Sequence, residues 1–193
     1  MIIRQCGRCV MDTTCSEINF DEQGVCNFCR TWEKKEKERK AEQLHPGLHW
    51  TINEIEKQKG KYNCLLGLSG GLDSSMVLHY AVAERGLKPL CFSFDNGWND
   101  PRADENVKKI VKKLGVNHFV YSVDMDEYHL LQEAFIKSGV RNIEIPTDHI
   151  LQALTYKIAK ENGIKYVLSG GNHATEGIMP ESWGYQPRDL KHI

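Results

Sequence analysis

Beginning at Tyr62, the sequence alternates short apolar runs with longer amphipathic stretches, and few folds accommodate such an order. Apolar runs of strand length, each followed by residues with helical spacing, predict successive β-α units. The apolar runs fall at residues 62–68, 88–95, 117–123 and 164–170. The helical stretches fall at residues 74–85, 103–115, 126–139 and 147–163. We therefore expect an α/β domain whose twisted parallel sheet carries helices on both faces.

Three loops that follow predicted strands are rich in glycine and polar residues. They are residues 69–75, 95–100 and 169–176. Right-handed crossovers place the carboxyl ends of parallel strands at one edge of the sheet, which is where open α/β sheets bind ligands. The three loops are therefore expected to converge.

The first of these loops reads SGGLDSS. Its two glycines permit backbone conformations and close ligand approach that a Cβ would block, and its three serines supply hydroxyl donors. The helix expected to begin near Asp73 or Ser74 would direct its free amides and positive dipole end into the bend. These features predict an anion cradle suited to phosphate, whereas a tight turn with a helix N-cap is the structural alternative. Neither the G-x-x-x-x-G-K-[ST] nor the G-x-G-x-x-G signature is present.

Composition restricts the partners. The chain has 193 residues, with 25 Lys and Arg against 26 Asp and Glu, for a formal net charge of -1. Such a balance provides no global basic field and argues against nucleic acid as a partner. The sequence has neither a signal-peptide apolar region at its start nor an apolar stretch of membrane-spanning length. We expect a cytoplasmic protein with no membrane span.

Five of the seven cysteines fall within the first 29 residues. Two Cys-x-x-Cys pairs, Cys6/Cys9 and Cys26/Cys29, have the spacing with which structural zinc sites wrap a tetrahedral Zn²⁺. Cys15 lies outside the pairs and is either a spare thiol or a participant in an iron-sulfur cluster. A segment with so few large apolar residues needs a staple, so unliganded cysteines are a poor alternative.

A charged segment, residues 30–45, follows the cysteines. Glu33/Lys37 and Glu36/Lys40 are opposite charges at helical i,i+4 spacing, which predicts an exposed helix that ends at His45-Pro46-Gly47. The expected domains are a four-cysteine zinc-binding module at 1–30, a charged helical linker at 31–61 and the α/β domain at 62–193.

The SGGLDSS loop, placed after the first strand of an α/β run, resembles the S-G-G-x-D-S-[ST] signature of the PP-loop ATP pyrophosphatase superfamily. The resemblance implies enzymes that cleave ATP to AMP and pyrophosphate while adenylating a carbonyl oxygen. It implies that Asp73 orients the loop or helps to hold Mg²⁺. It also implies pyrophosphate binding by Ser69, Gly70, Gly71, Ser74 and Ser75, and nucleotide packing near Phe94, Asp95, Gly170, Gly171 and Asn172.

More narrowly, four features resemble the N-acetyl sugar amidotransferases of bacterial surface-polysaccharide synthesis, the WbpG-like group. They are the Cys-x-x-Cys pairs, GLSGGLDSS, FDNGWN and SGGNHATEGIMPESWGY. The resemblance covers essentially the whole chain, although members of that group continue beyond the position of Ile193, so we expect a shortened form.

The narrower resemblance implies an ATP-dependent ligase of lipopolysaccharide O-antigen synthesis. The acetamido oxygen of a nucleotide-linked N-acetyl sugar would attack the α-phosphate of ATP, and ammonia would then displace AMP to leave an acetamidino group. Cys64 and Cys91 lie in apolar strands, where a buried, inert thiol is expected rather than a glutaminase nucleophile. A separate glutaminase subunit is therefore the expected ammonia donor, and Mg²⁺ is expected with ATP.

The candidate catalytic residues are Asp73 in the cradle and, beyond it, Asp95, Asn172 and Glu176. Asp95 would hold ribose or Mg²⁺, or else form a turn ahead of Asn96-Gly97. Glu176 would bind substrate or metal, or cap a helix. His173, Trp98 and Trp183 are weaker candidates, the tryptophans as stacking surfaces for a sugar or base.

Two other functions remain open. A tRNA-modifying PP-loop enzyme, for thiolation or lysidine-type ligation, shares the adenylation step but is expected to carry a basic face and cysteines near the cradle. A non-enzymatic adaptor that only binds nucleotide is the other alternative.

Overall fold

The computed structural model describes residues 3–41, 46–140, 142–172, 176–178 and 180. The chain divides into two compact units. The first unit contains residues 1–50 and 171–193, and the second contains residues 51–170. Within the described ranges, no helix is long and apolar enough to cross a membrane.

The second unit is built around a four-stranded sheet of β1 (Cys64–Gly67), β2 (Pro89–Asp95), β3 (Asn117–Ser122) and β4 (Val167–Leu168). Every pair of neighbours is parallel and the order is β3-β2-β1-β4, which confirms the predicted parallel sheet. The chain moves outward from β1 to β3 and then returns to the other side of β1. This reversal is a topological switch point, and such points open a crevice beyond the carboxyl ends of the strands.

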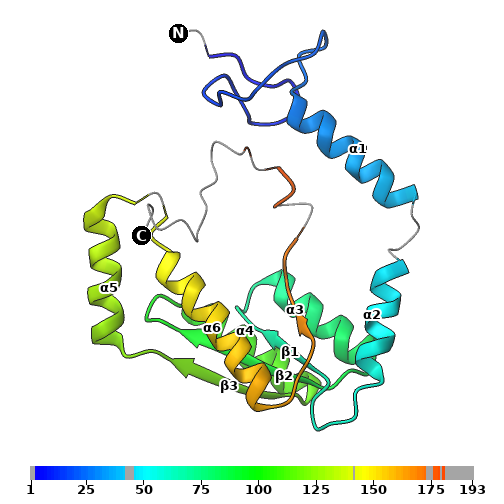
Figure 1. Ribbon diagram of the computed structural model, residues 1–193, viewed down its shortest axis with the longest axis vertical. Coiled ribbons are helices and arrows are strands. Elements are labelled where there is room, and N and C mark those ends of the chain that lie inside the picture. The colour runs from blue at the N-terminus through cyan, green and yellow to red at the C-terminus, as the bar shows by residue number, and fades with distance from the viewer. Residues whose placement is uncertain (1–2, 42–45, 141, 173–175, 179, 181–193) are drawn as a thin grey trace. The chain divides into compact units, whose positions relative to one another are not determined.

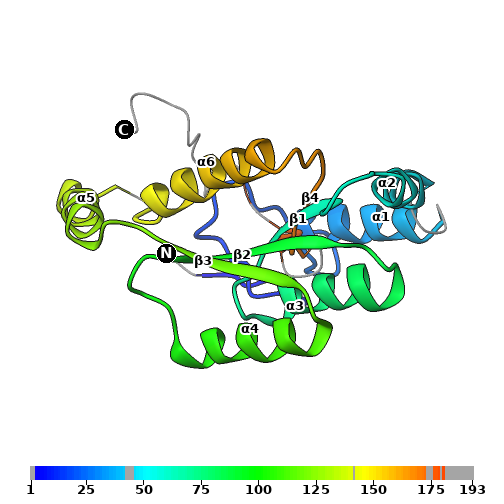
Figure 2. The same cartoon turned by 90° about the horizontal axis from the view of Figure 1, so that it is seen from below.

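Helices cover both faces of the sheet (Figures 1 and 2). The helices from Pro46 onward are α2 (Pro46–Glu56), α3 (Leu72–His79), the π-helix η1 (Tyr80–Glu84), α4 (Pro101–Leu114), α5 (Met125–Ser138) and α6 (Ile145–Glu161). Figure 2 shows α6 on one side of β1 and β2, with α3 and α4 on the other. The predicted two-sided arrangement is therefore confirmed.

Alternation of side chains along β1 explains the two faces. Leu65 packs with Leu154 and Ile158 of α6, whereas Leu66 packs with Leu78 of α3 and Val107 of α4. Successive strand residues point to opposite faces, so a strand covered on both sides must be apolar throughout. Truncating either leucine to alanine is expected to cost about 2–5 kcal/mol of stability.

The long helices begin and end at residues suited to those positions. The Asp100 carboxylate accepts a hydrogen bond from the Arg102 amide at 2.8 Å at the start of α4, and the Asp124 carboxylate accepts one from the Glu127 amide at 3.0 Å at the start of α5. Such N-caps satisfy amides that lack intrahelical partners. Both helices end at a glycine in the left-handed conformation.

Two helical details differ from the sequence-based prediction. The helix after the first loop begins at Leu72 rather than near Asp73 or Ser74, and it continues as η1. Residues 46–56 were expected only as part of a helical linker at 31–61, and the separate helix α2 was not predicted, because His45-Pro46-Gly47 indicates the end of a helix. Proline suits the first turn of a helix, where its missing amide would have no partner. Ile52 and Ile55 of α2 are buried against Cys64 and Ala81, so this helix contributes to a core.

The first unit contains the cysteine-rich segment and α1 (Asn27–Ala41). The predicted exposed helix is present, and the Lys40 ammonium lies 3.5 Å from the Glu36 carboxylate, as its spacing predicted. Glu33 instead pairs with Arg30 at 3.1 Å and with Arg8. The hydrogen bond from Arg39, helped by the charges of Arg39 and Lys40, lowers the pKa of Glu36 to about 2. Exposed pairs of this kind contribute little to stability.

Candidate functional site

The cradle loop, residues 69–75, leaves the sheet at the carboxyl end of β1. The Leu68 amide still donates to the Phe92 carbonyl at 2.8 Å, as in the parallel ladder, and the chain turns immediately afterwards. Gly70 adopts a φ of 74°, and Gly71 is the extended N-cap of α3. The predicted strand, bend and helix are therefore present, and the first turn of α3 faces the bend.

Serine hydroxyls organise this loop. The Ser69 amide donates to the Ser74 hydroxyl at 3.3 Å, and the two hydroxyl oxygens lie 3.1 Å apart. The Gly71 amide approaches the Ser69 hydroxyl at 3.4 Å. Ser74 is buried, whereas Ser69 and Gly71 are exposed. The loop thus presents exposed backbone and hydroxyl groups beside a helix N-terminus, an arrangement that favours an anion.

Two glycines allow close packing around the cradle. A Cβ on Gly70 would stand 2.2 Å from the Ala103 carbonyl oxygen in the first turn of α4, and the Asn106 amide group donates to the Gly70 carbonyl at 3.3 Å. A Cβ on Gly170, in the loop after β4, would stand 3.1 Å from the Ser74 amide nitrogen. The loop after β4 therefore reaches the cradle, as the topology predicted.

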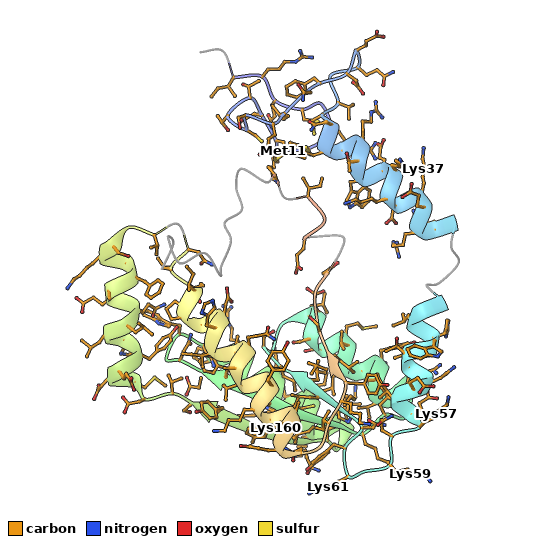
Figure 3. The ribbon with its side chains drawn as sticks, viewed as in Figure 1. Met11, Lys37, Lys57, Lys59, Lys61 and Lys160 are labelled. Carbon is orange, nitrogen blue, oxygen red and sulfur yellow. The ribbon has the colours of Figure 1, made fainter. Side chains whose placement is uncertain are left out.

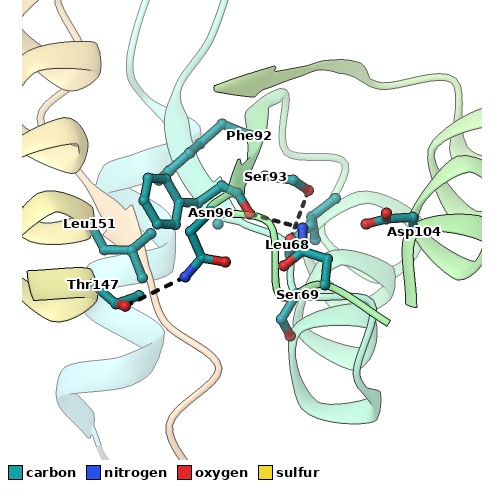
Figure 4. Close-up of a pocket in the computed structure, with 11 residues that line it drawn as sticks. Leu68, Ser69, Phe92, Ser93, Asn96, Asp104, Thr147 and Leu151 are labelled. Carbon is teal, nitrogen blue, oxygen red and sulfur yellow. Dashed lines mark hydrogen bonds between the residues drawn. The ribbon is translucent and has the colours of Figure 1, made fainter. Parts of the chain in front are cut away.

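A cavity of about 340 Å³ lies beside the cradle at the carboxyl edge of β1 and β2 (Figure 4). It is lined by Gly67, Leu68, Ser69, Phe92, Ser93, Phe94, Asn96, Asn99, Asp104, Thr147 and Leu151. The lining combines apolar side chains with hydroxyl, amide and carboxylate groups. A concave, largely apolar site with a few convergent polar groups is typical of small-molecule binding.

Asn96 joins the wall of this cavity to two helices. Its amide nitrogen donates to the Tyr128 hydroxyl at 3.2 Å and lies 3.5 Å from the Thr147 hydroxyl, and those two hydroxyls are 2.5 Å apart. All three side chains are buried. The loop after β2 is therefore held by α5 and α6, and buried networks of this kind rigidify the surrounding structure.

Asp95 occupies a turn rather than the cavity. Its carboxylate accepts from the Gly97 amide at 3.0 Å and from the Ser122 hydroxyl at 3.4 Å. It lines a separate hollow of about 200 Å³, whereas its neighbour Phe94 lines the larger cavity. The turn-forming alternative is thus present, and a role for Asp95 with ribose or Mg²⁺ stays a prediction.

The remaining predicted site residues are distributed between the two units, and two of them lie outside the described residues. Gly171, Asn172 and Glu176 belong to the first unit, where the Glu176 amide donates to the Asn172 carbonyl at 2.9 Å, and their part in the site stays a prediction. His173 and Trp183 lie outside the described residues. Trp98 is 67% exposed, and its indole nitrogen donates to the Gln132 side chain at 2.6 Å.

Several residues of the cavity were not predicted from the sequence. They include Ser93, Asn96, Asn99, Asp104, Thr147 and Leu151. Ser93 did carry a signal, because a serine near the end of the apolar strand run LCFSFD needs a hydrogen-bond partner inside the core. Thr147 and Leu151 carried none, because only tertiary packing brings α6 to the end of β2.

The four paired cysteines form one cluster in the first unit. The ligand sulfurs of Cys6, Cys9, Cys26 and Cys29 all lie within 4.8 Å of one another. The sulfurs of Cys9 and Cys26 are 3.7 Å apart. Four thiolates around one zinc ion, with metal-sulfur bonds of about 2.3 Å, stand about 3.8 Å from each other. The donor set therefore fits a tetrahedral metal ion.

Backbone amides point at the sulfurs of this cluster. The Cys26 amide donates to the Cys6 sulfur at 3.2 Å and the Arg8 amide donates to it at 3.4 Å. Burial raises the pKa of Cys6, but the amide donors, from Cys26 first, outweigh burial and lower that pKa to about 6. Burial raises the pKa of Cys9 and of Cys29. The amides therefore prepare at least one thiolate for a metal.

The other cysteines do not join this cluster. Cys15 is buried in the small core of the same segment and is not among the four grouped sulfurs. Cys64 and Cys91 are fully buried, and burial raises the pKa of each thiol to about 12. The expectation that these two thiols are buried is confirmed, and their raised pKa makes them poor nucleophiles.

A doubly wound α/β domain, with a serine- and glycine-rich anion cradle at its switch point and an adjoining cavity, is the architecture of a nucleotide-binding protein. A family model described as asparagine synthase matches residues 57–172. The chain belongs to this family, within the PP-loop ATP pyrophosphatase superfamily, whose members use ATP.

Three relatives illustrate the range of similarity. An uncharacterized protein of Methanocaldococcus jannaschii is 28% identical over 86% of this chain and 58% of its own length. A glutamine-hydrolyzing GMP synthase of Baumannia cicadellinicola is 38% identical over 40% of this chain and 15% of its own. A tRNA-specific 2-thiouridylase of Fusobacterium nucleatum is 27% identical over 55% and 32%. The chain thus spans less than two thirds of each relative.

Among solved structures, the fold is similar to that of the glutamine-dependent NAD+ synthetase of Acinetobacter baumannii in complex with ADP. The TM-score is 0.52 and the identity 22%, over 66% of this chain and 24% of the other. This likeness concerns the fold alone.

Proposed function

We propose that this chain carries the ATP-using site of an amidotransferase that converts an acetamido sugar into an acetamidino sugar. The sugar is proposed to be nucleotide-linked and destined for a surface polysaccharide such as lipopolysaccharide O-antigen. The observation that carries the proposal is the cradle at the switch point with a cavity directly beside it. The cradle would hold the departing pyrophosphate while the cavity holds the adenosine.

The chemistry requires activation because an amide oxygen is a poor leaving group. That oxygen attacks the α-phosphorus of ATP, and the bond between the α-phosphorus and the bridging oxygen breaks to release pyrophosphate. Ammonia then attacks the carbon of the O-adenylyl imidate, and AMP departs with the original amide oxygen. After proton loss the product is an amidine. Preorganised donors that meet developing charge give the largest catalytic contribution in reactions of this kind.

The cradle residues take roles that match their positions. The hydroxyls of Ser69, Ser74 and Ser75 and the first turn of α3 would contact pyrophosphate. Asp73 is exposed in that first turn, and its carboxylate is the hard oxygen ligand that Mg²⁺ prefers. Mg²⁺ bound with ATP would neutralise charge on the phosphates. Asp95, Asn172 and Glu176 are proposed to act on the ribose or the acceptor.

Ammonia is proposed to come from a separate glutaminase subunit. Glutamine hydrolysis needs an activated thiol with a basic partner. Among the described residues, the cysteines outside the cysteine-rich segment are Cys64 and Cys91, whose pKa burial raises to about 12. Neither suits that role.

The choice of an N-acetyl sugar rests on the resemblance of residues 169–185 to the WbpG-like amidotransferases. Trp98, exposed and held by Gln132 next to the cavity loop, is a suitable surface for a sugar ring.

Zn²⁺ is the proposed occupant of the cysteine cluster. Two Cys-x-x-Cys pairs with grouped sulfurs and amide donors favour a structural, closed zinc site. The metal would stabilise the first unit, whose core is small and consists largely of cysteines. An iron-sulfur cluster that includes Cys15 is the competing occupant.

The test supplies the purified protein with ATP, Mg²⁺, ammonium and a panel of acceptors, and measures AMP and pyrophosphate. Turnover that depends on a UDP-linked acetamido sugar is expected. Ser74→Ala should weaken pyrophosphate and ATP binding without unfolding, because it removes the buried hydroxyl between Ser69 and Gly71. Ser138→Ala, which removes a hydroxyl at the end of α5, is the matched control. Unchanged activity in Ser74→Ala would contradict the cradle assignment.

A tRNA-modifying enzyme is the second candidate, since one relative named above modifies tRNA. Four lysines labelled in Figure 3, Lys57, Lys59, Lys61 and Lys160, precede β1 or β4 and so belong to the amino-end edge of the sheet, opposite the cradle. A tRNA substrate that reached the cradle would gain nothing from them. AMP formation that depends on tRNA rather than on a sugar would establish this alternative.

A further inference from the structure

The peptide unit between Leu68 and Ser69 is held at both ends by side chains from different parts of the second unit. Its carbonyl oxygen accepts a hydrogen bond of 2.7 Å from the Ser93 hydroxyl, and its amide donates to the Ser74 hydroxyl at 3.3 Å. Figure 4 shows Leu68, Ser69 and Ser93 together at the wall of the cavity. This peptide is the point at which β1 becomes the cradle, so its orientation determines which way the Ser69 amide points.

Ser93 is itself held by His118. The ring nitrogen Nε2 of His118, on the adjacent strand β3, lies 2.9 Å from the Ser93 hydroxyl oxygen. A hydroxyl has one proton to donate. Because Ser93 gives that proton to the Leu68 carbonyl, Nε2 of His118 must carry the proton that it shares with Ser93. Only a ring protonated on Nε2 satisfies both hydrogen bonds.

The surroundings favour the neutral ring. Ser93 is 8% exposed, and burial lowers the pKa of His118. The charged groups that share the small hollow with the ring are Asp95, Asp104 and Lys108. Burial thus favours the neutral imidazole, which exists as two tautomers.

We propose that His118 is a positioning residue for pyrophosphate binding, acting through Ser93 to fix the peptide between Leu68 and Ser69. These hydrogen bonds connect three adjacent strands, from His118 on β3 through Ser93 on β2 to the end of β1. If either of the hydrogen bonds made by Ser93 were lost, this peptide could rotate. The Ser69 amide would then leave the Ser74 hydroxyl, and the cradle would lose its arrangement of donors. The proposal rests on the proposed use of ATP at the cradle.

Four variants test the hydrogen bonds that connect His118 and Ser93 to the Leu68 carbonyl. Ser93→Ala removes the relay hydroxyl and Ser93→Thr keeps it; His118→Leu removes the donor, and His118→Gln retains an amide donor near the position of Nε2. Losing one such hydrogen bond is expected to weaken binding of Mg²⁺-pyrophosphate about threefold to tenfold. The retaining variants should bind nearly as tightly as the unaltered protein. AMP affinity should not change in the His118 variants, because His118 is not among the residues that line the proposed adenosine cavity.

A double variant of Ser93 and His118 distinguishes a positioning role from a general loss of stability. Ser93→Ala combined with His118→Leu should bind pyrophosphate no more weakly than either single variant, because all three break the same connection between His118 and the Leu68 carbonyl. Thermal midpoints of the variants show whether folding has changed. Pyrophosphate affinity that is unaltered in both Ser93→Ala and His118→Leu would overturn the proposal.

A spectroscopic measurement on the unaltered protein stands even if Ser93→Ala fails to fold. Proton-nitrogen correlation spectra of the histidine rings, assigned by His118→Gln, should show His118 as the neutral tautomer protonated on Nε2. A ring protonated on Nδ1 would refute the relay. This spectrum and the pyrophosphate titration need no acceptor, so they test the role of His118 alone. The proposed function fails separately, if no acetamido sugar supports AMP formation.

Discussion

Gly170, in the loop after β4, lies so close to Ser74 that a Cβ on the glycine would stand 3.1 Å from the serine amide nitrogen. The two residues are almost one hundred positions apart in the sequence and meet at the switch point of the sheet. Their proximity brings the loop after β4 against the cradle. The amide of Ser74 sits in the first turn of α3, where pyrophosphate is proposed to bind.

Gly170→Ala should therefore weaken ATP binding while leaving the fold intact. The added methyl would displace the first turn of α3 by a few tenths of an ångström, and donors around an anion lose strength with such displacement. We expect several-fold weaker ATP binding, measured by calorimetry, with a small change in the free energy of unfolding. Affinity equal to that of the unaltered protein would show that this turn does not contact the nucleotide.

Gly70→Ala is predicted to be more damaging than other alanine substitutions at glycine. Gly70 combines a φ of 74° with a Cβ position 2.2 Å from the Ala103 carbonyl oxygen. Left-handed strain and overpacking together should cost about 2–5 kcal/mol, seen in urea unfolding, and should abolish pyrophosphate binding.

The matched control for that prediction is Gly86→Ala. Gly86 has a φ of 62° but no atom within 4 Å of its Cβ position. Gly86→Ala should therefore lower the free energy of unfolding by the strain contribution alone, about 1–2 kcal/mol, and the variant should keep its ligand affinity. Equal effects at the two glycines would mean that contact between the cradle and α4 is unimportant.

The cysteine cluster should bind one metal ion per chain. Cys26→Ser removes one of the four grouped sulfurs and is expected to lose the metal, as measured by elemental analysis. Cys15→Ser is the control, because Cys15 is equally buried but outside the group. Iron in place of zinc, or loss of metal in the control, would identify an iron-sulfur centre instead.

Cys64 and Cys91 should resist alkylation in the folded protein. Burial raises the pKa of each from its ordinary value of 9.0 to about 12. A raised pKa means less thiolate at a given pH, so at pH 8 reaction with iodoacetamide should be about 1,000-fold slower than for an ordinary thiol. The rate should rise tenfold per pH unit until near pH 12. Mass spectrometry of labelled peptides, with the unfolded chain as control, would reveal a reactive thiol if one exists.

Local patterns in the sequence predicted much of the fold. Apolar runs and helical periodicity depend on near neighbours, so the parallel sheet, its two covered faces and the helix after the cradle could be anticipated. The start of α2 as a separate helix within the expected helical linker was not predicted, because Pro46 suits both the end of one segment and the first turn of the next. The pairing of Glu33 with Arg8 and Arg30 was missed because a side chain chooses among partners in space.

The candidate site was predictable only in part. For Asp95 the sequence allowed either a ligand of ribose or Mg²⁺ or a turn, and the Gly97 amide and the Ser122 hydroxyl both donate to its carboxylate in the turn. The relay through Ser93 and His118 was not predicted, since it depends on the register of two parallel strands. Register follows from packing between strands and not from the residues of either strand alone.

Contacts between near neighbours in the chain specify a glycine- and serine-rich bend between a strand and a helix, and they space two cysteine pairs so that the pairs can share a metal. Long-range packing is needed for Gly170 to reach Ser74, for Ser93 to hold the end of β1, and for α6 to complete the cavity. Local conformation follows from the steric and hydrogen-bonding preferences of neighbouring residues. Contacts between distant residues follow instead from the burial of both sheet faces, which sets strand order and brings the loops together.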